Sequence, residues 1–166
     1  MNTSPKLLVL KLFLDQLGVS DDIATVGDRK RVQKAVYLGQ VAGADLGYRF
    51  SWYLMGPYSP GLTEDYFELD TKRDLVREAG TGKVLHPQYV LALRAIKPLL
   101  DPPEDIPLRQ EQWLELLASY HYLRRVSKLQ DSQAVDVLAN KKPALVHFVD
   151  HARNAIDRNP ALGTPG

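Results

Sequence analysis

The sequence predicts a mainly helical protein that folds as a single compact domain of about six or seven helices with a minor β-hairpin or wing. Apolar residues recur at three- and four-residue steps over most of the chain. Proline-marked starts and glycine or proline stops separate these runs. Only two short segments, 48–55 and 83–85, have the composition of strands. We assign the domain to residues 1–158 and expect the tail, 159–166, to be disordered.

The first predicted helix spans residues 4–18. Ser4 is a helix cap, Pro5 suits the first helical position and Gly18 is a typical stop. Four leucines form one apolar stripe that we expect to be buried: Leu7, Leu10, Leu14 and Leu17.

A second helix is predicted over residues 28–43, after a polar loop at 19–27, with Asp28 as its cap. One face carries small and branched residues, which indicates that another element approaches closely: Val32, Ala35, Val36, Gly39 and Gly43. The opposite face carries cations and is expected to be solvated: Arg29, Lys30 and Lys34.

The segment 48–55 is rich in aromatic residues and is expected to be an extended, largely buried strand. The Gly-Pro pair at 56–57 ends it, and the Ser-Pro pair at 59–60 opens a helix near 60–70. The segment 83–85 is predicted to supply the second strand of the small hairpin or wing.

Four further helices follow from apolar stripes bounded by prolines or polar caps. The first begins after His86 and ends at the Asp-Pro-Pro run that starts at residue 101. The predicted spans are 87–100, 109–126, 131–140 and 144–157.

The bulk composition excludes several classes of function. The 21 basic and 20 acidic residues leave a net charge of +1, which gives no broad attraction to nucleic acid or anionic lipid. The chain has no cysteine, so disulfides, thiolate zinc sites and cysteine nucleophiles are excluded, and a reducing cytoplasm is the expected location. No apolar run approaches the twenty or so residues of a membrane span.

Catalytic and metal-binding motifs are also weak. His147 and His151 are four residues apart on the last predicted helix and could share a metal, but the H-E-x-x-H pattern is absent and no third ligand is near. His121 is expected to be a packed histidine. The chain has no G-x-S-x-G motif and no glycine-rich phosphate loop. We therefore predict no catalytic residues, no metal and no cofactor, and rank a hydrolase based on the two histidines last.

Nucleic-acid binding is a stronger alternative. A cluster of cations opens the second helix, and aromatic residues that could stack on bases follow it: Arg29, Lys30, Arg31 and Lys34, with Arg49, Trp52 and Tyr53. The competing interpretation places the aromatic residues in the core and the charges on a solvated face. The balanced net charge favours that second interpretation.

Two segments carry a family resemblance. The helix at 31–38 resembles a K-L-Q-K-x-x-Y family start, and the run at 48–62 resembles the aromatic-GPYS segment of the same family. The stretches 115–123 and 141–152 are similar to its C-terminal half. Over residues 30–156 the chain thus resembles the YwgA-like proteins and, more distantly, the Panacea (SocA-like) antitoxin domain.

The chain departs from these patterns in three places. Arg31 and Val32 replace the usual lysine and leucine, which are mild changes. The Panacea corner usually reads G-P-V, whereas this chain has tyrosine at position 58 and is therefore nearer the YwgA-like form. The resemblance implies a prokaryotic helical interaction module, often encoded beside toxins or antiviral-defence genes, and it implies no catalytic residue.

The predicted function is accordingly a non-enzymatic, antitoxin-like or accessory protein-interaction module whose partner is a toxin or defence effector encoded nearby. A nucleic-acid-binding regulator is the alternative. Because tyrosine, tryptophan and arginine dominate interface energetics, the candidate partner-binding residues are Arg49, Trp52, Tyr53 and Tyr58. Alternation along the strand places Phe50, Trp52 and Leu54 on one face with a structural role. Tyr53, Tyr58 and Arg49 are left over for binding.

Overall fold

The computed structural model describes residues 4–163. Within that range the chain forms nine α-helices and one two-stranded antiparallel hairpin, in a single compact domain. The predicted fold class is confirmed.

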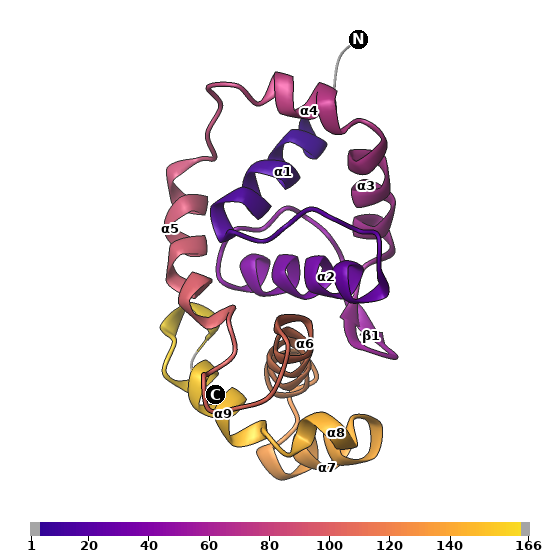
Figure 1. The fold of residues 1–166 in the computed structure, drawn as a ribbon. Coiled ribbons are helices and arrows are strands. Elements are labelled where there is room, and N and C mark those ends of the chain that lie inside the picture. The colour runs from indigo at the N-terminus through magenta and orange to yellow at the C-terminus, as the bar shows by residue number, and fades with distance from the viewer. Residues whose placement is uncertain (1–3, 164–166) are drawn as a thin grey trace.

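Helix α2 (Val26–Val41) lies across the middle of the molecule and separates two groups of helices (Figure 1). The first group surrounds it on one side and comprises α1 (Pro5–Leu17), α3 (Pro60–Thr71), α4 (Arg73–Ala79) and α5 (Pro87–Ile96). The second group lies on the other side and comprises α6 (Gln110–His121), α7 (Asp131–Lys141), α8 (Pro143–Val146) and α9 (Val149–Asp157). Since α2 contacts both α1 and α6, its central residues are buried and both groups share one core.

Local cap chemistry explains several helix ends. Ser4 precedes Pro5, and Gly18 takes the left-handed conformation that ends α1, as predicted. Helix α2 begins two residues before the predicted start because Thr25, not Asp28, is its cap. Asp28 is instead the third residue of a capping box, in which it accepts a hydrogen bond from the Thr25 backbone.

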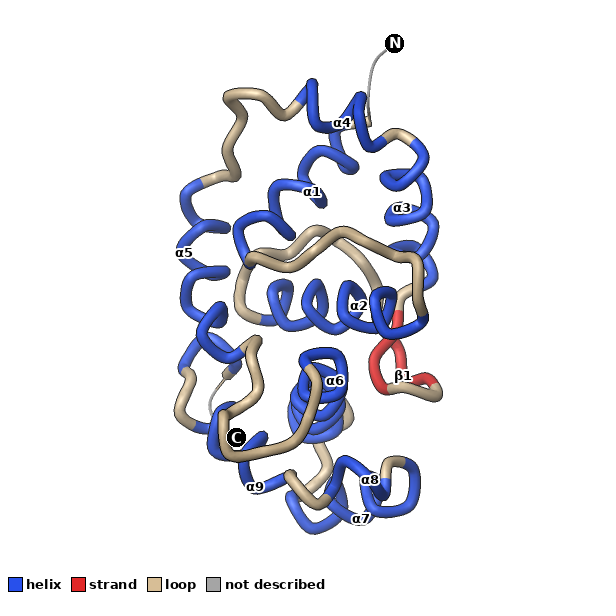
Figure 2. The backbone as a smooth tube through the Cα atoms, in the orientation of Figure 1, coloured by secondary structure: helices blue, strands red, loops and turns tan. Residues whose placement is uncertain are grey.

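The hairpin is built from one continuous segment, so the predicted second strand at 83–85 is wrong. Strand β1 (Ser51–Tyr53) pairs with β2 (Gly56–Tyr58), and residues 83–85 lie in a loop (Figure 2). Gly56 has a φ of +96°, so it turns the chain back after Leu54 and Met55 rather than ending the sheet. The expectation of a largely buried strand is also wrong, since Leu54 is 79% exposed.

The predicted helices of the C-terminal half are found with two differences. Helix α6 continues as π-helical turns over Tyr122–Val126. The predicted helix at 144–157 is broken between α8 and α9, at residues 147–148. In the N-terminal half, α4 has no counterpart among the predicted helices.

The tail prediction is wrong for its first residues. Pro160–Leu162 forms a 3-10 turn capped by the Asn159 side chain, and Leu162 is only 2% exposed. Its apolar side chain returns to the core, which offsets the entropy of ordering the segment. The rest of the predicted tail, 164–166, lies outside the described residues.

Candidate functional site

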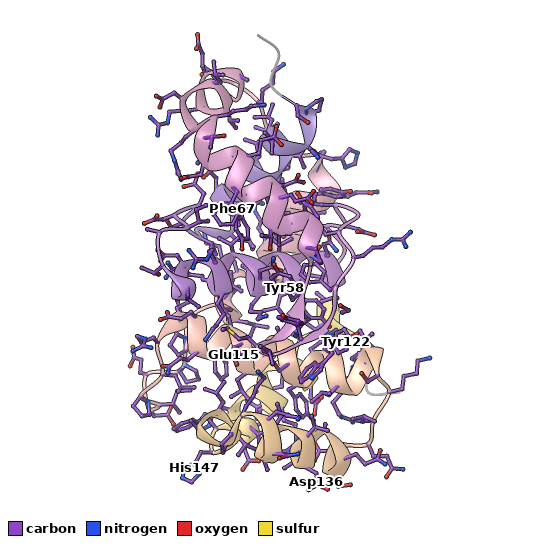
Figure 3. The ribbon with its side chains drawn as sticks, turned by 90° about the vertical axis from the view of Figure 1, so that its right-hand side faces the viewer. Tyr58, Phe67, Glu115, Tyr122, Asp136 and His147 are labelled. Carbon is purple, nitrogen blue, oxygen red and sulfur yellow. The ribbon has the colours of Figure 1, made fainter. Side chains whose placement is uncertain are left out.

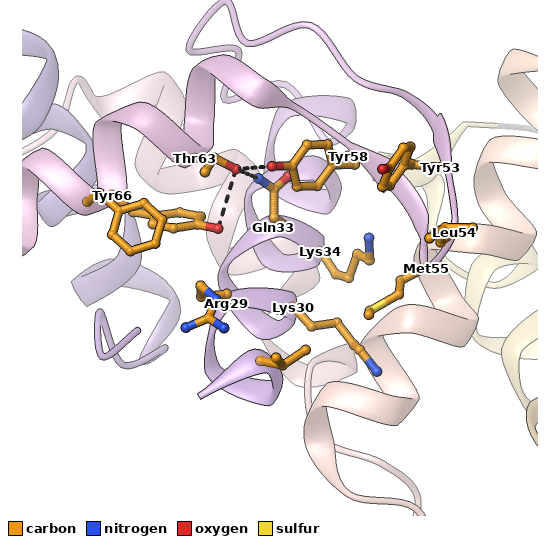
Figure 4. Close-up of a pocket in the computed structure, with 12 residues that line it drawn as sticks. Arg29, Lys30, Gln33, Lys34, Tyr53, Leu54, Met55, Tyr58, Thr63 and Tyr66 are labelled. Atoms are coloured by element: carbon orange, nitrogen blue, oxygen red, sulfur yellow. Dashed lines mark hydrogen bonds between the residues drawn. The ribbon is translucent and has the colours of Figure 1, made fainter. Parts of the chain in front are cut away.

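A pocket of about 340 Å³ lies where α2, the hairpin and α3 meet (Figure 4). This volume is at the lower end of the roughly 300–1,000 Å³ of ligand sites. Its walls combine cationic, aromatic and aliphatic side chains: Val26, Arg29, Lys30, Gln33, Lys34, Tyr53, Leu54, Met55, Tyr58, Thr63, Tyr66 and Phe67.

Two neighbouring residues of α2 hold the hairpin in place. The Gln33 amide donates to the Ser59 carbonyl and accepts from the Ser59 N–H, both at 2.9 Å. The Lys34 ammonium donates to the Pro57 carbonyl at 2.7 Å. These bonds satisfy backbone groups at the end of β2 that have no third strand to pair with. The pocket wall is therefore fixed to the central helix.

Close approach on the other side of the hairpin depends on Gly56. A Cβ at this position would lie 2.3 Å from the Ser119 Oγ of α6, in addition to requiring a positive φ. Glycine is therefore needed both for the turn and for the contact with α6.

Hydroxyl and amide groups form one end of the pocket. Thr63 Oγ1 accepts a hydrogen bond from the Gln33 amide at 3.0 Å and lies 2.6 Å from the Tyr58 hydroxyl and 3.3 Å from that of Tyr66. The rings of Tyr53 and Tyr58 are 5.5 Å apart and tilted. These contacts orient Tyr58 at the pocket wall (Figure 4).

A buried charge network lies beneath the pocket. Lys30 is 2.7 Å from Glu115 Oε1, and Lys142 is 2.8 Å from Glu115 Oε2. Lys142 also donates to the Leu54 carbonyl in the hairpin turn, at 3.1 Å. Burial lowers the pKa of Lys34 to about 7, with Lys142 and Lys30 adding repulsion and Glu115 opposing it.

Exposed apolar residues gather around this pocket. Among the described residues, nine large apolar side chains are exposed, and five of them line the pocket: Val26, Tyr53, Leu54, Met55 and Phe67. Phe67 on α3 and Tyr58 on the hairpin lie along one side of the molecule (Figure 3). Contiguous exposed apolar surface of this kind marks interaction sites.

The structure brings two separately predicted sets of residues together. Tyr53 and Tyr58 came from the partner-binding set, and three cations came from the nucleic-acid set: Arg29, Lys30 and Lys34. All five line the one pocket.

Three residues of the same sets lie elsewhere. Arg49 is exposed in the loop before β1. Trp52 packs on Tyr122, with their ring centroids 5.8 Å apart, and Arg31 pairs with Asp28.

The prediction that the cationic face of the second helix is solvated is wrong for Lys34. This residue is only 2% exposed, because α2 is covered on that side by the hairpin and by α6. Lys30 and Arg29 are half-buried, and Arg29 donates to the Ile23 carbonyl.

Sequence reasoning missed several residues of the site. Gln33, Thr63, Tyr66 and Phe67 line the pocket, and Glu115 with Lys142 forms the network under it. The two segments that carry the family resemblance are in direct contact, since Gln33 and Lys34 bind the hairpin. The resemblance of both segments to one family was therefore the signal that could have predicted their contact and the pocket residues between them. Nothing local indicated Glu115 or Lys142, whose partners are distant in sequence.

The histidines do not form a metal site in the described part of the chain. His147 lies in the break between α8 and α9, so the assumed one-face spacing with His151 is wrong. His151 instead contacts Asp105 at 3.2 Å, and residues 4–163 contain no cluster of three or more metal-ligating side chains. His121 is packed as predicted: its Nε2 donates to the Leu162 carbonyl, and its Nδ1 accepts from Tyr37.

Comparisons with protein-family models, curated proteins and solved structures return no match to this chain. The YwgA-like resemblance therefore stays a prediction. Of the helices in residues 4–163, none combines the length and the apolar character needed to cross a membrane.

Proposed function

We propose that the chain is a non-enzymatic protein-interaction module that binds an apolar side chain of a partner protein in the pocket between α2, the hairpin and α3. The observation that carries this proposal is the concentration of exposed apolar side chains at that pocket. Burying them on a partner would remove apolar surface from water.

The resemblance to YwgA-like proteins extends this proposal to an antitoxin-like or accessory subunit. The partner would be a toxin or defence effector encoded nearby, and both proteins would act in the cytoplasm. The partner surface is expected to carry acidic groups beside the apolar one, because cationic side chains line the pocket.

Binding to a protein is favoured over binding to nucleic acid by the state of the cations. Nucleic-acid grooves track the phosphate backbone with accessible lysine and arginine side chains. Here Lys30 and Arg31 are paired with carboxylates, so they are not free to follow a phosphate backbone.

The test is co-purification of the tagged chain with the product of the adjacent gene. We expect the variant Tyr53→Ser/Phe67→Ser to weaken capture at least about tenfold, which corresponds to about 1.4 kcal/mol. The matched control, Val84→Ser/Leu91→Ser, changes two exposed apolar residues outside the pocket and should leave capture unchanged.

Equal losses in the two double variants would contradict the proposed site. An electrophoretic shift of DNA or RNA at low salt that disappears when Arg29 and Lys30 are neutralised would instead support the regulator alternative.

A further inference from the structure

The Lys34 ammonium is a buried cation without a carboxylate of its own. Both oxygens of the nearby Glu115 are engaged, one by Lys30 and one by Lys142. Within the described residues, the hydrogen-bond acceptor of Lys34 is a neutral one, the Pro57 carbonyl. An ammonium has three N–H donors, so the remaining two have no acceptor in this part of the chain.

This arrangement favours an anion as ligand. Three lysines share a single carboxylate beneath the pocket, and a buried cation that lacks a counter-charge is costly. An incoming carboxylate would supply that counter-charge. In Figure 4, Lys34 lies among the lining residues, between Lys30 and the pair Tyr53 and Tyr58.

The wall beside Lys34 favours an apolar group on the same ligand. Tyr53, Tyr58 and Met55 line the pocket near the hairpin, and Tyr66 and Phe67 line it along α3. A volume of about 340 Å³ leaves space for one large side chain rather than for several residues.

We infer that the pocket binds the C-terminal residue of a partner polypeptide, with the terminal carboxylate on Lys34 and an apolar or aromatic side chain against the tyrosine wall. Within a polypeptide, only the last residue carries an apolar side chain and a carboxylate on the same Cα. In an internal segment, the carboxylate that reaches Lys34 would belong to an aspartate or glutamate, and the apolar side chain against the wall would belong to another residue. The inference rests on the proposed function, and it names the feature of the partner that is recognised.

The test uses three peptide probes in an NMR titration of the full chain at pH 6.5: acetyl-Gly-Gly-Phe with a free C-terminus, the same peptide as the amide, and acetyl-Gly-Phe-Glu-amide. We expect the free acid to bind at least about tenfold more tightly than either amide, because charge-assisted hydrogen bonds are the stronger kind. The largest shifts should fall on residues 33–34 and 57–58.

Two further measurements identify the cation. Lys34→Met, checked for folding, should abolish the preference for the free acid, whereas Lys83→Met, at an exposed site outside the pocket, should keep it. In the unmodified protein, affinity for the free acid should fall as pH rises from 6 to 9, because Lys34 loses its proton while the carboxylate stays ionised.

The inference is overturned if none of the peptides binds, if acid and amide bind equally, if the internal glutamate peptide binds best, or if Lys34→Met keeps the preference. None of these outcomes contradicts the proposed function if the Tyr53→Ser/Phe67→Ser variant fails to capture the partner protein. If that variant still binds both the partner and the peptide, the pocket is not the binding site, and both the proposed function and the inference are contradicted.

Discussion

At the scale of single residues, Lys34 has two roles that pull in opposite directions. Its hydrogen bond to the Pro57 carbonyl ties the hairpin to α2. Its burial beside Lys30 and Lys142 opposes the charged form and lowers the pKa to about 7, against 10.5 for a free lysine. The residue is thus structurally useful and electrostatically costly at neutral pH.

This conflict predicts a pH dependence of stability. Between pH 7 and 9 the unfolded chain keeps the Lys34 proton while the folded chain releases it, so the unfolded state binds more protons. The free energy of unfolding should therefore rise with pH, by at most about 1.4 kcal/mol per unit from this group. Chemical denaturation at pH 7, 8 and 9 measures the slope.

The Lys34→Met variant should lose that contribution to the slope, and Lys83→Met should retain it. A slope that is the same in both variants would show that Lys34 is not the responsible group.

At the scale of elements, the face of α2 that packs on α1 and α5 leaves no space at Gly39. A Cβ there would lie 2.2 Å from the Phe13 ring and 2.8 Å from a Leu93 methyl group. Gly27, in the first turn of the same helix, faces only the flexible Glu111 side chain, at 3.3 Å from its nearest atom. The two glycines have different reasons for being present.

Replacement by alanine should therefore destabilise the protein at Gly39 but not at Gly27. Gly39→Ala is expected to lower the free energy of unfolding by about 1–3 kcal/mol through overpacking. Gly27→Ala is expected to be neutral or to stabilise by up to about 1 kcal/mol, because alanine loses less backbone entropy. Urea denaturation of both variants compares them, and equal effects would contradict the packing argument.

Most helices could be predicted from the sequence because their signals are local. Ser4 with Pro5, Ser59 with Pro60 and His86 with Pro87 open α1, α3 and α5 as expected. The hairpin prediction is wrong because the Gly-Pro pair indicates a strand end, whereas the positive φ of Gly56 makes it a turn. Seven of the twelve lining residues are absent from the predicted sets, because the pocket walls come from segments that only tertiary packing brings together.

The C-terminal 3-10 turn is a whole element that local sequence signals do not predict, because it depends on tertiary packing. Proline and glycine in the tail indicate disorder, but Leu162 is buried in a site formed by α2, α5 and α9. His121 of α6 adds a hydrogen bond to the Leu162 carbonyl at 2.9 Å. A single apolar side chain thus decides whether the segment is ordered.

We expect Leu162→Ala to lower the free energy of unfolding by about 2–5 kcal/mol, the usual cost of truncating a buried leucine. Leu91→Ala, at a residue that is 65% exposed, should change it by no more than about 0.5 kcal/mol. Thermal or urea unfolding measures both. A loss as small as that of the control would mean that the turn does not contribute to stability.

At the scale of the whole molecule, Glu115 connects parts of the chain that are distant in sequence. It lies on α6 and pairs with Lys30 on α2 and with Lys142, the residue before α8. Lys142 in turn binds the Leu54 carbonyl of the hairpin turn. The central helix α2, the second group of helices and the pocket wall are therefore joined through one carboxylate.

Removing this charge should destabilise the whole domain. Glu115→Gln keeps the side-chain shape but leaves Lys30 and Lys142 without their anion, and breaking a buried ion pair costs about 3–5 kcal/mol. Glu111→Gln is the matched control on the same helix, because its partner Arg109 is mostly exposed and such pairs contribute at most about 1 kcal/mol. Adding Lys142→Met to Glu115→Gln should recover part of the loss, since one uncompensated cation is removed. Denaturant unfolding of the unmodified protein and these three variants measures the free energy of unfolding. Equal losses of stability in Glu115→Gln and Glu111→Gln, or a further loss in the double variant, would show that Glu115 does not act as the shared counter-charge.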